Sequence, residues 1–343
     1  MKKLNYEEYF KGPVSDWYSA VWAEPNIMHE LDLVNTKDIY HYTDINGFIS
    51  IMENQELWAS HIRFMNDYSE YLYGEKMFIK EIDKKMPEVS EEEKEILQRV
   101  KKSLQNVVSE GILSHSKEDV FSLSFSQNEN SLEMWRGYSK NSGIAIGFDF
   151  SEYAENLRLV GTETYEELLE KAGGKVEKIC PEKEHVFFPV KVCYDKEEKE
   201  ALIKNILELG LVYAENYKEK EGDKDPIIPT VGYLSDLIFD FIPYLKQEGF
   251  RGEEEYRILY NHLSDEDKSK GIHYRGRKGI ILPYIKCKMI DKNCRILEKL
   301  PIKKIIIGPG LNQDKVKESV EYFLKKKGQS YLVEKSDIPY VPM

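Results

Sequence analysis

The stretch that most constrains the fold runs from residue 39 to residue 70, where strand and helix signals alternate. It begins with a β-prone segment, IYHYT, and Thr43 or Asp44 then offers a short side-chain oxygen that can cap a helix. The residues that follow form one apolar stripe at helical spacing: Ile45, Phe48, Ile49 and Met52. Residues 57–60 predict a second strand, and residues 66–67 predict the turn after it. We therefore expect a compact strand–helix–strand unit that carries the functional site.

A second informative block covers residues 119–150. Its segment FSLSFS alternates apolar and hydroxyl side chains, which is the period of a strand with one apolar face and one polar face. The polar face carries Ser122, Ser124 and Ser126. A loop with two asparagines follows, then a short helix bearing Met134, Trp135 and Tyr138, and a further strand at 143–150.

The rest of the chain adds helices and strands without an internal repeat or a Pro/Ser linker. Helices are expected at 71–85, 90–113, 196–220, 230–247 (kinked or ended by Pro243) and 313–327, the last capped by Asn312. Strands are expected at 186–194, within 250–260, and at 280–290, 302–307 and 331–334, and residues 151–184 predict a surface insertion.

This order of elements favours one mixed α/β domain over two independent domains. Residues 1–38 are rich in aromatic side chains and are expected to pack on the body as a lead-in. The body, residues 39–343, would be a single domain with helical insertions at about 71–115 and 196–248.

Composition excludes several classes of protein. The 343 residues carry a net charge of −12, and this argues against a protein that binds duplex nucleic acid through a basic face. The four cysteines form no CxxC pair, which is typical of reduced thiols in the cytoplasm. The first residues, MKKLNYEEYFKG, lack the apolar run of a signal peptide, and no run approaches the roughly 20 apolar residues of a membrane span. A cytoplasmic protein without a membrane partner is expected.

Several familiar sites are missing from the sequence. There is no GxGxxG, no HExxH and no nucleophile elbow, and the segment around Gly308 lacks the Gly-Lys-Ser/Thr ending of a phosphate-binding loop. The cysteine spacing does not indicate zinc, so no metal is expected. Three polar clusters remain on β-rich segments: His41 with Tyr42 and Thr43, the serines at 122–126, and the pair Glu253 and Glu255.

The Glu-x-Glu pair has a chemical interpretation. Alternate residues of an extended chain point to the same side, so Glu253 and Glu255 would address one ligand. Two close carboxylates suit a transition state that develops positive charge on a sugar ring. The alternative is a solvated charge run, because Glu254 completes EEE. Taken alone, His41 is equally compatible with a buried core histidine, and the serines with an exposed strand face.

The order of short motifs resembles a bacterial family catalogued as a domain of unknown function. The motifs are Tyr40-His41-Tyr42-Thr43, Leu57-Trp58-Ala59, Asn66-Asp67-x-x-Glu70, Phe121-Ser122-x-Ser124, Met134-Trp135-x-x-Tyr138, Gly143-Ile144-x-Ile146-Gly147-Phe148, Glu253-x-Glu255-Tyr256-Arg257, Ile306-Ile307-Gly308-Pro309 and Ser336-x-Ile338-Pro339-Tyr340. The chain departs from the family's usual pattern at three positions: Tyr68 replaces Pro, and Glu133 and Gly137 replace Leu and His.

That family is in turn similar to the ADP-ribosyltransferase fold, an α+β split β-sandwich that holds NAD in a cleft without a Rossmann motif. The resemblance implies that a histidine on the first core strand, His41, binds the adenosine ribose together with Tyr42 and Thr43. It implies that Ser122 or Ser124, with Tyr138 as a further candidate, packs around the nicotinamide end. It also implies that the late glutamate, Glu255, holds the nicotinamide ribose.

The function that follows from the resemblance is NAD-dependent transfer of ADP-ribose to a protein or nucleic-acid acceptor. NAD would be the substrate, Glu255 would stabilise the ribosyl cation, and Glu253 would orient or deprotonate the acceptor. The setting that the resemblance implies is a bacterial toxin or anti-phage effector, with an antitoxin or regulatory partner. Two alternatives stay open: a non-catalytic sensor domain that binds a nucleotide or a protein in the same cleft, and an RNA-directed nuclease or phosphotransferase-like enzyme.

Overall fold

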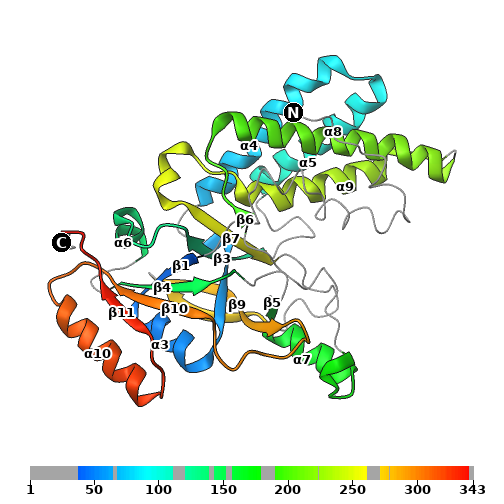
Figure 1. The fold of residues 1–343 in the computed structure, drawn as a ribbon. Coiled ribbons are helices and arrows are strands. Elements are labelled where there is room, and N and C mark those ends of the chain that lie inside the picture. The colour runs from blue at the N-terminus through cyan, green and yellow to red at the C-terminus, as the bar shows by residue number, and fades with distance from the viewer. Residues whose placement is uncertain are drawn as a thin grey trace. The chain divides into compact units, whose positions relative to one another are not determined.

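The computed structural model describes residues 38–64, 68–110, 120–138, 143–151, 157–178, 190–222, 224–260, 271–277 and 279–339. These residues form two compact units, which are coloured along the chain in Figure 1. The helical unit consists of the described residues within 66–119 and 192–248. The sheet unit consists of the described residues within 34–65, 120–191 and 249–343.

All strands of the described chain belong to the sheet unit, where they form one 11-stranded sheet. The strands are β1 (Asp38–Thr43), β2 (Leu57–His61), β3 (Phe121–Ser126), β4 (Ile144–Asp149), β5 (Leu157–Gly161), β6 (Val190–Lys191), β7 (Glu255–Tyr260), β8 (His273–Arg277), β9 (Ile280–Asp291), β10 (Ile302–Ile307) and β11 (Leu332–Lys335). The main path runs β11-β10-β4-β1-β3-β2-β9-β5, while β7 pairs with β3 and β6, and β8 pairs with β9. Apart from the parallel pair β10–β11, these ladders are antiparallel.

The predicted strand–helix–strand unit is present as β1, α3 (Ile45–Asn54) and β2. Asp44 caps the helix by accepting a hydrogen bond from the Gly47 backbone N–H at 2.8 Å, and Gln55 ends the helix in the left-handed region at φ 52°. The buried side of α3 carries Phe48, Ile51 and Met52. Ile49 of the predicted stripe is exposed instead, since Ile51 takes the inward position.

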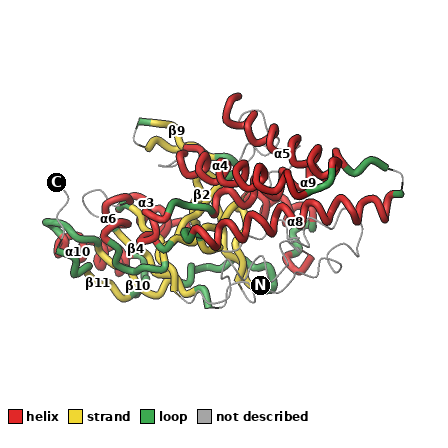
Figure 2. Tube along the Cα trace, turned by 90° about the horizontal axis from the view of Figure 1, so that it is seen from above, coloured by secondary structure: helices red, strands yellow, loops and turns green. Residues whose placement is uncertain are grey.

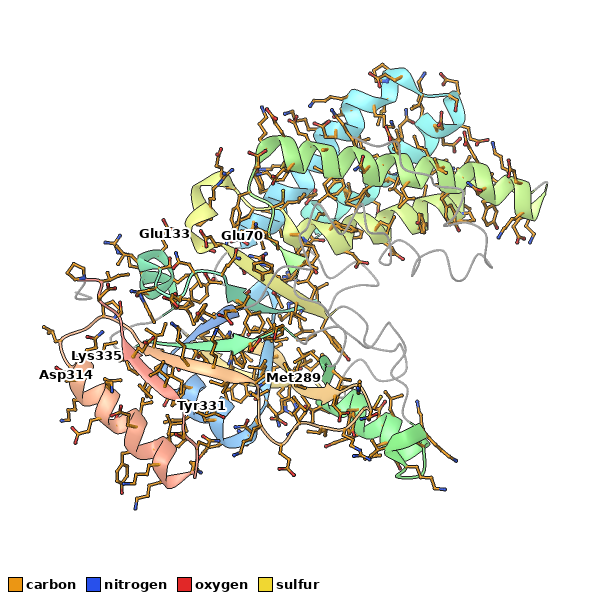
Figure 3. The ribbon with its side chains drawn as sticks, in the orientation of Figure 1. Glu70, Glu133, Met289, Asp314, Tyr331 and Lys335 are labelled. Carbon is orange, nitrogen blue, oxygen red and sulfur yellow. The ribbon has the colours of Figure 1, made fainter. Side chains whose placement is uncertain are left out.

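The two faces of the sheet have separate cores. One face packs against α3 and α10 (Gln313–Lys326), and its core includes Leu123, Phe125, Ile146 and Val320. The ion pair between Asp314 and Lys335, 2.6 Å apart and both labelled in Figure 3, joins α10 to β11. The other face packs against α6 (Leu132–Tyr138), whose core cluster consists of Tyr40, Tyr42, Met134, Trp135, Ala145 and Ile306. The edge strand β5 packs against α7 (Thr162–Lys171).

The helical unit contains α4 (Tyr68–Lys85), α5 (Glu91–Glu110), α8 (Lys196–Glu221) and α9 (Ile227–Phe241), which lie as long red tubes in Figure 2. Ser90 and Glu93 form the expected capping box at the start of α5, with the Ser90 N–H donating to Glu93 Oε2 at 2.7 Å. Two buried lysines connect its segments. Lys199 Nζ donates to the Lys246 carbonyl at 2.7 Å, and Lys246 Nζ pairs with Glu70, labelled in Figure 3, at 2.8 Å.

The apolar stripe expected on α9 is confirmed. Leu234, Leu237, Ile238 and Phe241 are all fully buried. The α-helix ends at Phe241, and Pro243 lies in the 3₁₀ turn that follows, as expected for a residue that cannot continue the helix.

Several local predictions are corrected by the structure. Residues 151–184 are more than a surface insertion, because β5 adds to the sheet by pairing with β9. Strand β8 was not predicted, and within the described residues the strand expected at 186–194 is confined to 190–191. The Asn312 side chain makes no capping hydrogen bond to α10. The aromatic lead-in, except Asp38, and the turn at 66–67 lie outside the described residues.

The observed architecture agrees with the expected α+β class, because a large mixed sheet and separate helices are both present. None of the helices in the described ranges combines the length and the apolar character needed to cross a membrane.

Candidate functional site

Strand β3 is the point at which the sheet splits. Along one edge, β7 pairs with the whole of β3, from Phe121 to Ser126. Two different strands share the other edge: β1 pairs at Ser126, and β2 pairs at Ser122 and Phe121. Between them, the Ser124 carbonyl oxygen lies 3.0 Å from His41 Nδ1. The imidazole of β1 therefore satisfies a backbone acceptor where the two strands diverge.

Strand register places a set of polar side chains on one face of the sheet. Directly paired residues share a face, so Ser122, Ser124 and Ser126 lie on the same side as Leu259, Arg257 and Glu255 of β7. Ser60 of β2 is opposite Ser122, and Tyr284 of β9 is opposite Ser60. Trp58 is two residues before Ser60 and therefore faces the same side. We call this set the polar face: Trp58, Ser60, Ser122, Ser124, Ser126, Glu255, Arg257 and Tyr284.

Several buried groups of the polar face have no hydrogen-bond partner in the described chain. They are Ser122 Oγ, Ser124 Oγ and Trp58 Nε1, together with Nε of Arg275, which comes from β8 and donates through Nη2 to Ser60 Oγ at 2.8 Å. Each unsatisfied buried polar group costs about 1–3 kcal/mol. Such groups are uncommon, and a local concentration of them marks a place where a ligand or water completes the hydrogen bonds.

His41 is neutral near pH 7. Burial lowers the pKa of its imidazole to about 4, the hydrogen bond to the Ser124 carbonyl opposes this shift, and the positive charges of Arg275 and Arg277 add to it. A carbonyl oxygen only accepts, so Nδ1 carries the proton and donates it to Ser124. The other nitrogen, Nε2, is then a hydrogen-bond acceptor. The ring also makes an edge contact with Phe125, 5.8 Å between centroids, so it leans toward the apolar face of β3.

Glu255 lies on the polar face but is already engaged. Its side chain is 2% exposed, and its two oxygens accept hydrogen bonds from Arg257 Nε at 2.8 Å and Nη2 at 2.7 Å. This two-point geometry holds the carboxylate in one orientation.

The expected alignment of Glu253 with Glu255 on one strand is wrong. Glu253 ends a 3₁₀ helix (Glu248–Glu253), and β7 begins only at Glu255. Between them Glu254 has φ 42°, in the left-handed region, which interrupts the alternation that an extended chain would give. Glu253 is half-buried and precedes the strand, so the two carboxylates do not form a same-side pair by strand geometry.

The three other expected ligand-binding residues have packing roles in the structure. The Tyr42 hydroxyl donates to the Asn128 carbonyl at 2.8 Å and accepts from the Ser131 N–H at 3.0 Å, and its ring lies 4.6 Å from that of Trp135. Thr43 ends β1, and its Oγ1 occupies the space where a side chain on Gly47 would lie. Tyr138 is partly buried against the cluster of α6.

The end of β3 and the loop after it, residues 127–131, hold the backbone segment that leads into Glu255. Ser126 Oγ donates to the Glu253 carbonyl at 2.6 Å, and the Gln127 N–H donates to the Glu254 carbonyl at 2.9 Å. The carboxylate of Glu133, labelled on α6 in Figure 3, fills the space beside Gly252. The segment before β7 is thus held to the end of β3 through hydrogen bonds and lies close to the Glu133 side chain of α6.

The C-terminal Ser336 motif contributes to the same loop. Ser336 Oγ donates to Asn130 Oδ1 at 2.6 Å, which also accepts from Trp135 Nε1 at 2.9 Å. Asn130 Nδ2 donates to Asp337 Oδ1 at 2.7 Å. Motifs separated by most of the chain therefore meet around one loop.

Four residues of the site, Ser60, Arg257, Arg275 and Tyr284, are not indicated as site residues by any pattern described above for the sequence. Arg257 belongs to the motif Glu253-x-Glu255-Tyr256-Arg257, but the resemblance gives a ligand-binding role to Glu255 and none to Arg257. For Arg275, the available signal was the alternation His273-Tyr274-Arg275-Gly276-Arg277, which marks a strand with cationic residues on one side. In the described residues, no group of three or more His, Cys, Asp or Glu side chains is arranged to hold a metal ion.

Part of the chain matches the model of a known protein family. Residues 134–258 match the model of a family described as a protein of unknown function (DUF2971). The matched segment begins in α6 and ends in β7, so it includes Glu253 and Glu255 and excludes β1, β2 and β3. Neither a curated protein nor a solved structure matches the chain.

Proposed function

We propose that this protein is an NAD-dependent ADP-ribosyltransferase whose sheet is a split β-sandwich of the ADP-ribosyltransferase type. The observation that carries the proposal is the combination at β3. His41 bonds the Ser124 carbonyl at the split, while Glu255 shares a face with Ser122 and Ser124. These are the three positions, far apart in sequence, that the family resemblance assigned to one NAD site.

The unpartnered groups give the polar face the capacity to bind a polar ligand. Ser122 and Ser124 are free to hydrogen-bond a substrate, since their hydroxyls have no partner in the described chain. His41 follows Tyr40, which pairs with Ser126, so its side chain points away from the polar face. At the split between β1 and β2 its Nε2, an acceptor when Nδ1 is protonated, suits a ribose hydroxyl. These features support binding of a nucleotide sugar and do not depend on a Rossmann motif.

The proposed reaction breaks the bond between the ribose C1′ and the nicotinamide nitrogen, and the bonding electron pair leaves with neutral nicotinamide. The cationic ribosyl centre is stabilised by the Glu255 carboxylate, which Arg257 holds in a fixed orientation. An acceptor oxygen or nitrogen then bonds to C1′, and its proton passes to Glu253. The proposed setting remains a toxin or anti-phage effector in the cytoplasm, acting on a macromolecular acceptor and controlled by an antitoxin or regulatory partner.

One observation favours a second candidate, a nucleotide-binding domain without catalysis. Both oxygens of Glu255 accept hydrogen bonds from Arg257, and the side chain is almost fully buried. If that pair stays closed when a nucleotide is bound, the carboxylate cannot approach the ribose and the polar face would act as a sensor.

The test is to incubate the purified full chain with NAD labelled on the adenylate and with cell lysate. Part of each reaction is treated with nuclease and part with protease, and free nicotinamide is measured in parallel. The proposal predicts label on a macromolecule, sensitive to one of the two treatments, together with nicotinamide release. Saturable NAD binding without nicotinamide release would support the sensor candidate instead. If the protein neither binds NAD nor releases nicotinamide, both candidates are rejected.

A further inference from the structure

The structure contains a half-buried arginine that forms no ion pair within the described residues. Arg275 of β8 forms no ion pair with any carboxylate in the described residues, and neither does Arg277 two positions later. Burial lowers the pKa of Arg275 and the positive charge of Arg277 lowers it further, while Tyr284 and the carboxylate of Asp44 oppose the shift. A partly desolvated guanidinium normally requires an anionic partner, because removing a charge from water is costly.

The surroundings of Arg275 fix the guanidinium in place. Its Nη2 donates to Ser60 Oγ at 2.8 Å. Its Cζ lies 5.2 Å from the ring centre of Trp58 and 5.3 Å from that of Tyr284. The two rings are 4.6 Å apart and form a tilted pair. Contacts between a guanidinium and aromatic faces stabilise the cation and leave its edge available for hydrogen bonds.

The unsatisfied groups beside this arginine share one chemical property. Arg275 Nε and Trp58 Nε1 can only donate hydrogen bonds, and the hydroxyls of Ser122 and Ser124 can also donate. Ser122 pairs directly with Ser60, the residue that Arg275 contacts. A ligand that completes this set must present several acceptor oxygens and negative charge.

We propose that Arg275, Trp58, Ser60 and Ser122 form an anion subsite that takes the diphosphate group of a dinucleotide. This assignment extends the proposed function, since the diphosphate joins the two halves of NAD, but the subsite itself would bind diphosphate whether or not NAD is cleaved. Diphosphate oxygens are acceptors only, and their negative charge would give the guanidinium an ion-pair partner. A planar guanidinium suits such oxygens because it can donate two parallel hydrogen bonds.

The main test is calorimetric titration of the full chain with inorganic pyrophosphate, ADP-ribose and adenosine at constant ionic strength. Arg275→Gln should weaken binding of pyrophosphate and ADP-ribose by about 10- to 100-fold, the effect of losing hydrogen bonds from a charged donor. Adenosine has no phosphate, so its binding should not depend on Arg275. Arg295→Gln removes an equal charge at an exposed position of the same unit and should leave all three titrations unchanged.

A second variant guards against a simple folding defect. Ser122→Ala removes an unpartnered buried hydroxyl, so it should leave the melting temperature of the free protein equal or higher. The same change should weaken pyrophosphate binding by about 3- to 10-fold through the lost hydrogen bond. If the hydroxyl had a purely structural role, Ser122→Ala would lower the melting temperature and leave pyrophosphate binding unchanged.

The proposal is overturned if Arg275→Gln binds pyrophosphate and ADP-ribose as the wild type does, or if the folded wild type binds neither at concentrations up to about 10 mM. The outcome is separable from that of the proposed function. Diphosphate binding that depends on Arg275 without nicotinamide release retains the subsite and rejects the transferase. Nicotinamide release that does not depend on Arg275 retains the transferase and rejects the subsite.

Discussion

At the residue scale, the central question is what Glu255 does when its oxygens are held by Arg257. Under the proposed mechanism, Glu255→Gln removes the charge that faces the developing cation. Transfer should fall by roughly two to four orders of magnitude, which is the usual effect of losing one preorganised electrostatic contact. NAD binding should persist. Glu253→Gln should instead reduce acceptor modification more than NAD hydrolysis, because its role begins after nicotinamide leaves.

A structural control is needed, because Glu255→Gln also breaks the buried ion pair with Arg257. Breaking a buried pair from one side costs about 3–5 kcal/mol of stability. The double variant Glu255→Gln, Arg257→Gln removes both charges and should recover most of that stability in denaturant unfolding. It should remain inactive. Near-normal transfer in either variant would exclude Glu255 as the stabilising carboxylate.

Glu75 provides a pH-dependent prediction in the helical unit. Its side chain is about 1% exposed, and neither carboxylate oxygen has a hydrogen-bond partner in the described chain. Burial raises its pKa to about 7, with Lys76 opposing the shift. The folded state therefore holds a proton that the unfolded chain releases above its ordinary pKa of 4.5. Stability should fall as the pH rises from about 4.5 to 7 and then level off.

Glu75→Gln should remove that loss. Above pH 7 the variant should be more stable than the wild type by about 1–3 kcal/mol, and the two should converge near pH 4. Urea unfolding at several pH values measures the difference. Glu88→Gln, at an exposed position near the end of α4, is the matched control and should give parallel curves. A wild type whose stability is independent of pH over this range would contradict the assignment.

At the element scale, the contact between α8 and α9 depends on one glycine. A Cβ on Gly210 would lie 2.7 Å from Leu234 Cδ1 and 2.8 Å from its Cδ2, and Leu234 is fully buried. Beside this contact the rings of Tyr213 and Tyr233 stack at 4.2 Å with an interplanar angle of 16°. The close approach of the two helices therefore requires the absence of a side chain.

Gly210→Ala and Gly232→Ala should have opposite effects on stability. Alanine favours a helix by about 1 kcal/mol over glycine, but at 210 overpacking against Leu234 should cost about 1–3 kcal/mol and prevail. Gly232 lies on α9 with no atom within 4 Å of an added Cβ, so the substitution there should stabilise the protein by about 0.5–1 kcal/mol. Chemical denaturation of both variants tests the pair. Stabilisation at 210 would show that the helices separate readily.

At the scale of the whole molecule, a ligand that binds only the folded state must stabilise it. If NAD occupies the polar face, NAD at about 100 times its dissociation constant should raise the free energy of unfolding by about 2.7 kcal/mol. Thermal unfolding with NAD, ADP-ribose and nicotinamide measures this. ADP-ribose should stabilise the wild type and should stabilise Arg275→Gln clearly less at the same concentration, as expected for about 10- to 100-fold weaker binding. An equal shift in both proteins would place the nucleotide away from Arg275.

Much of the local structure could be predicted from the sequence. The alternation in FSLSFS predicts β3, the Asp44 cap and apolar spacing predict α3, and the Ser90–Glu93 box predicts the start of α5. These features depend on side chains within a few residues of one another, so they can be predicted from one sequence without knowledge of its tertiary contacts. Strands β5 and β8 could not be predicted in this way. Both pair with β9, and an edge strand is stabilised by pairing with its neighbour more than by the alternation of apolar and polar residues in its own sequence.

The sequence by itself determined most of the segments that form strands and helices, with β5 and β8 as exceptions, and the polar residue types that they carry. Only the tertiary structure decided which distant residues come into contact. Arg257 hydrogen-bonds Glu255, Arg275 hydrogen-bonds Ser60, and β1 and β2 pair with different ends of β3. The tertiary structure also decided the left-handed turn at Glu254, which separates Glu253 from the strand. Register between distant strands sets these outcomes, and register follows from burial of the entire apolar face, a property no local pattern contains.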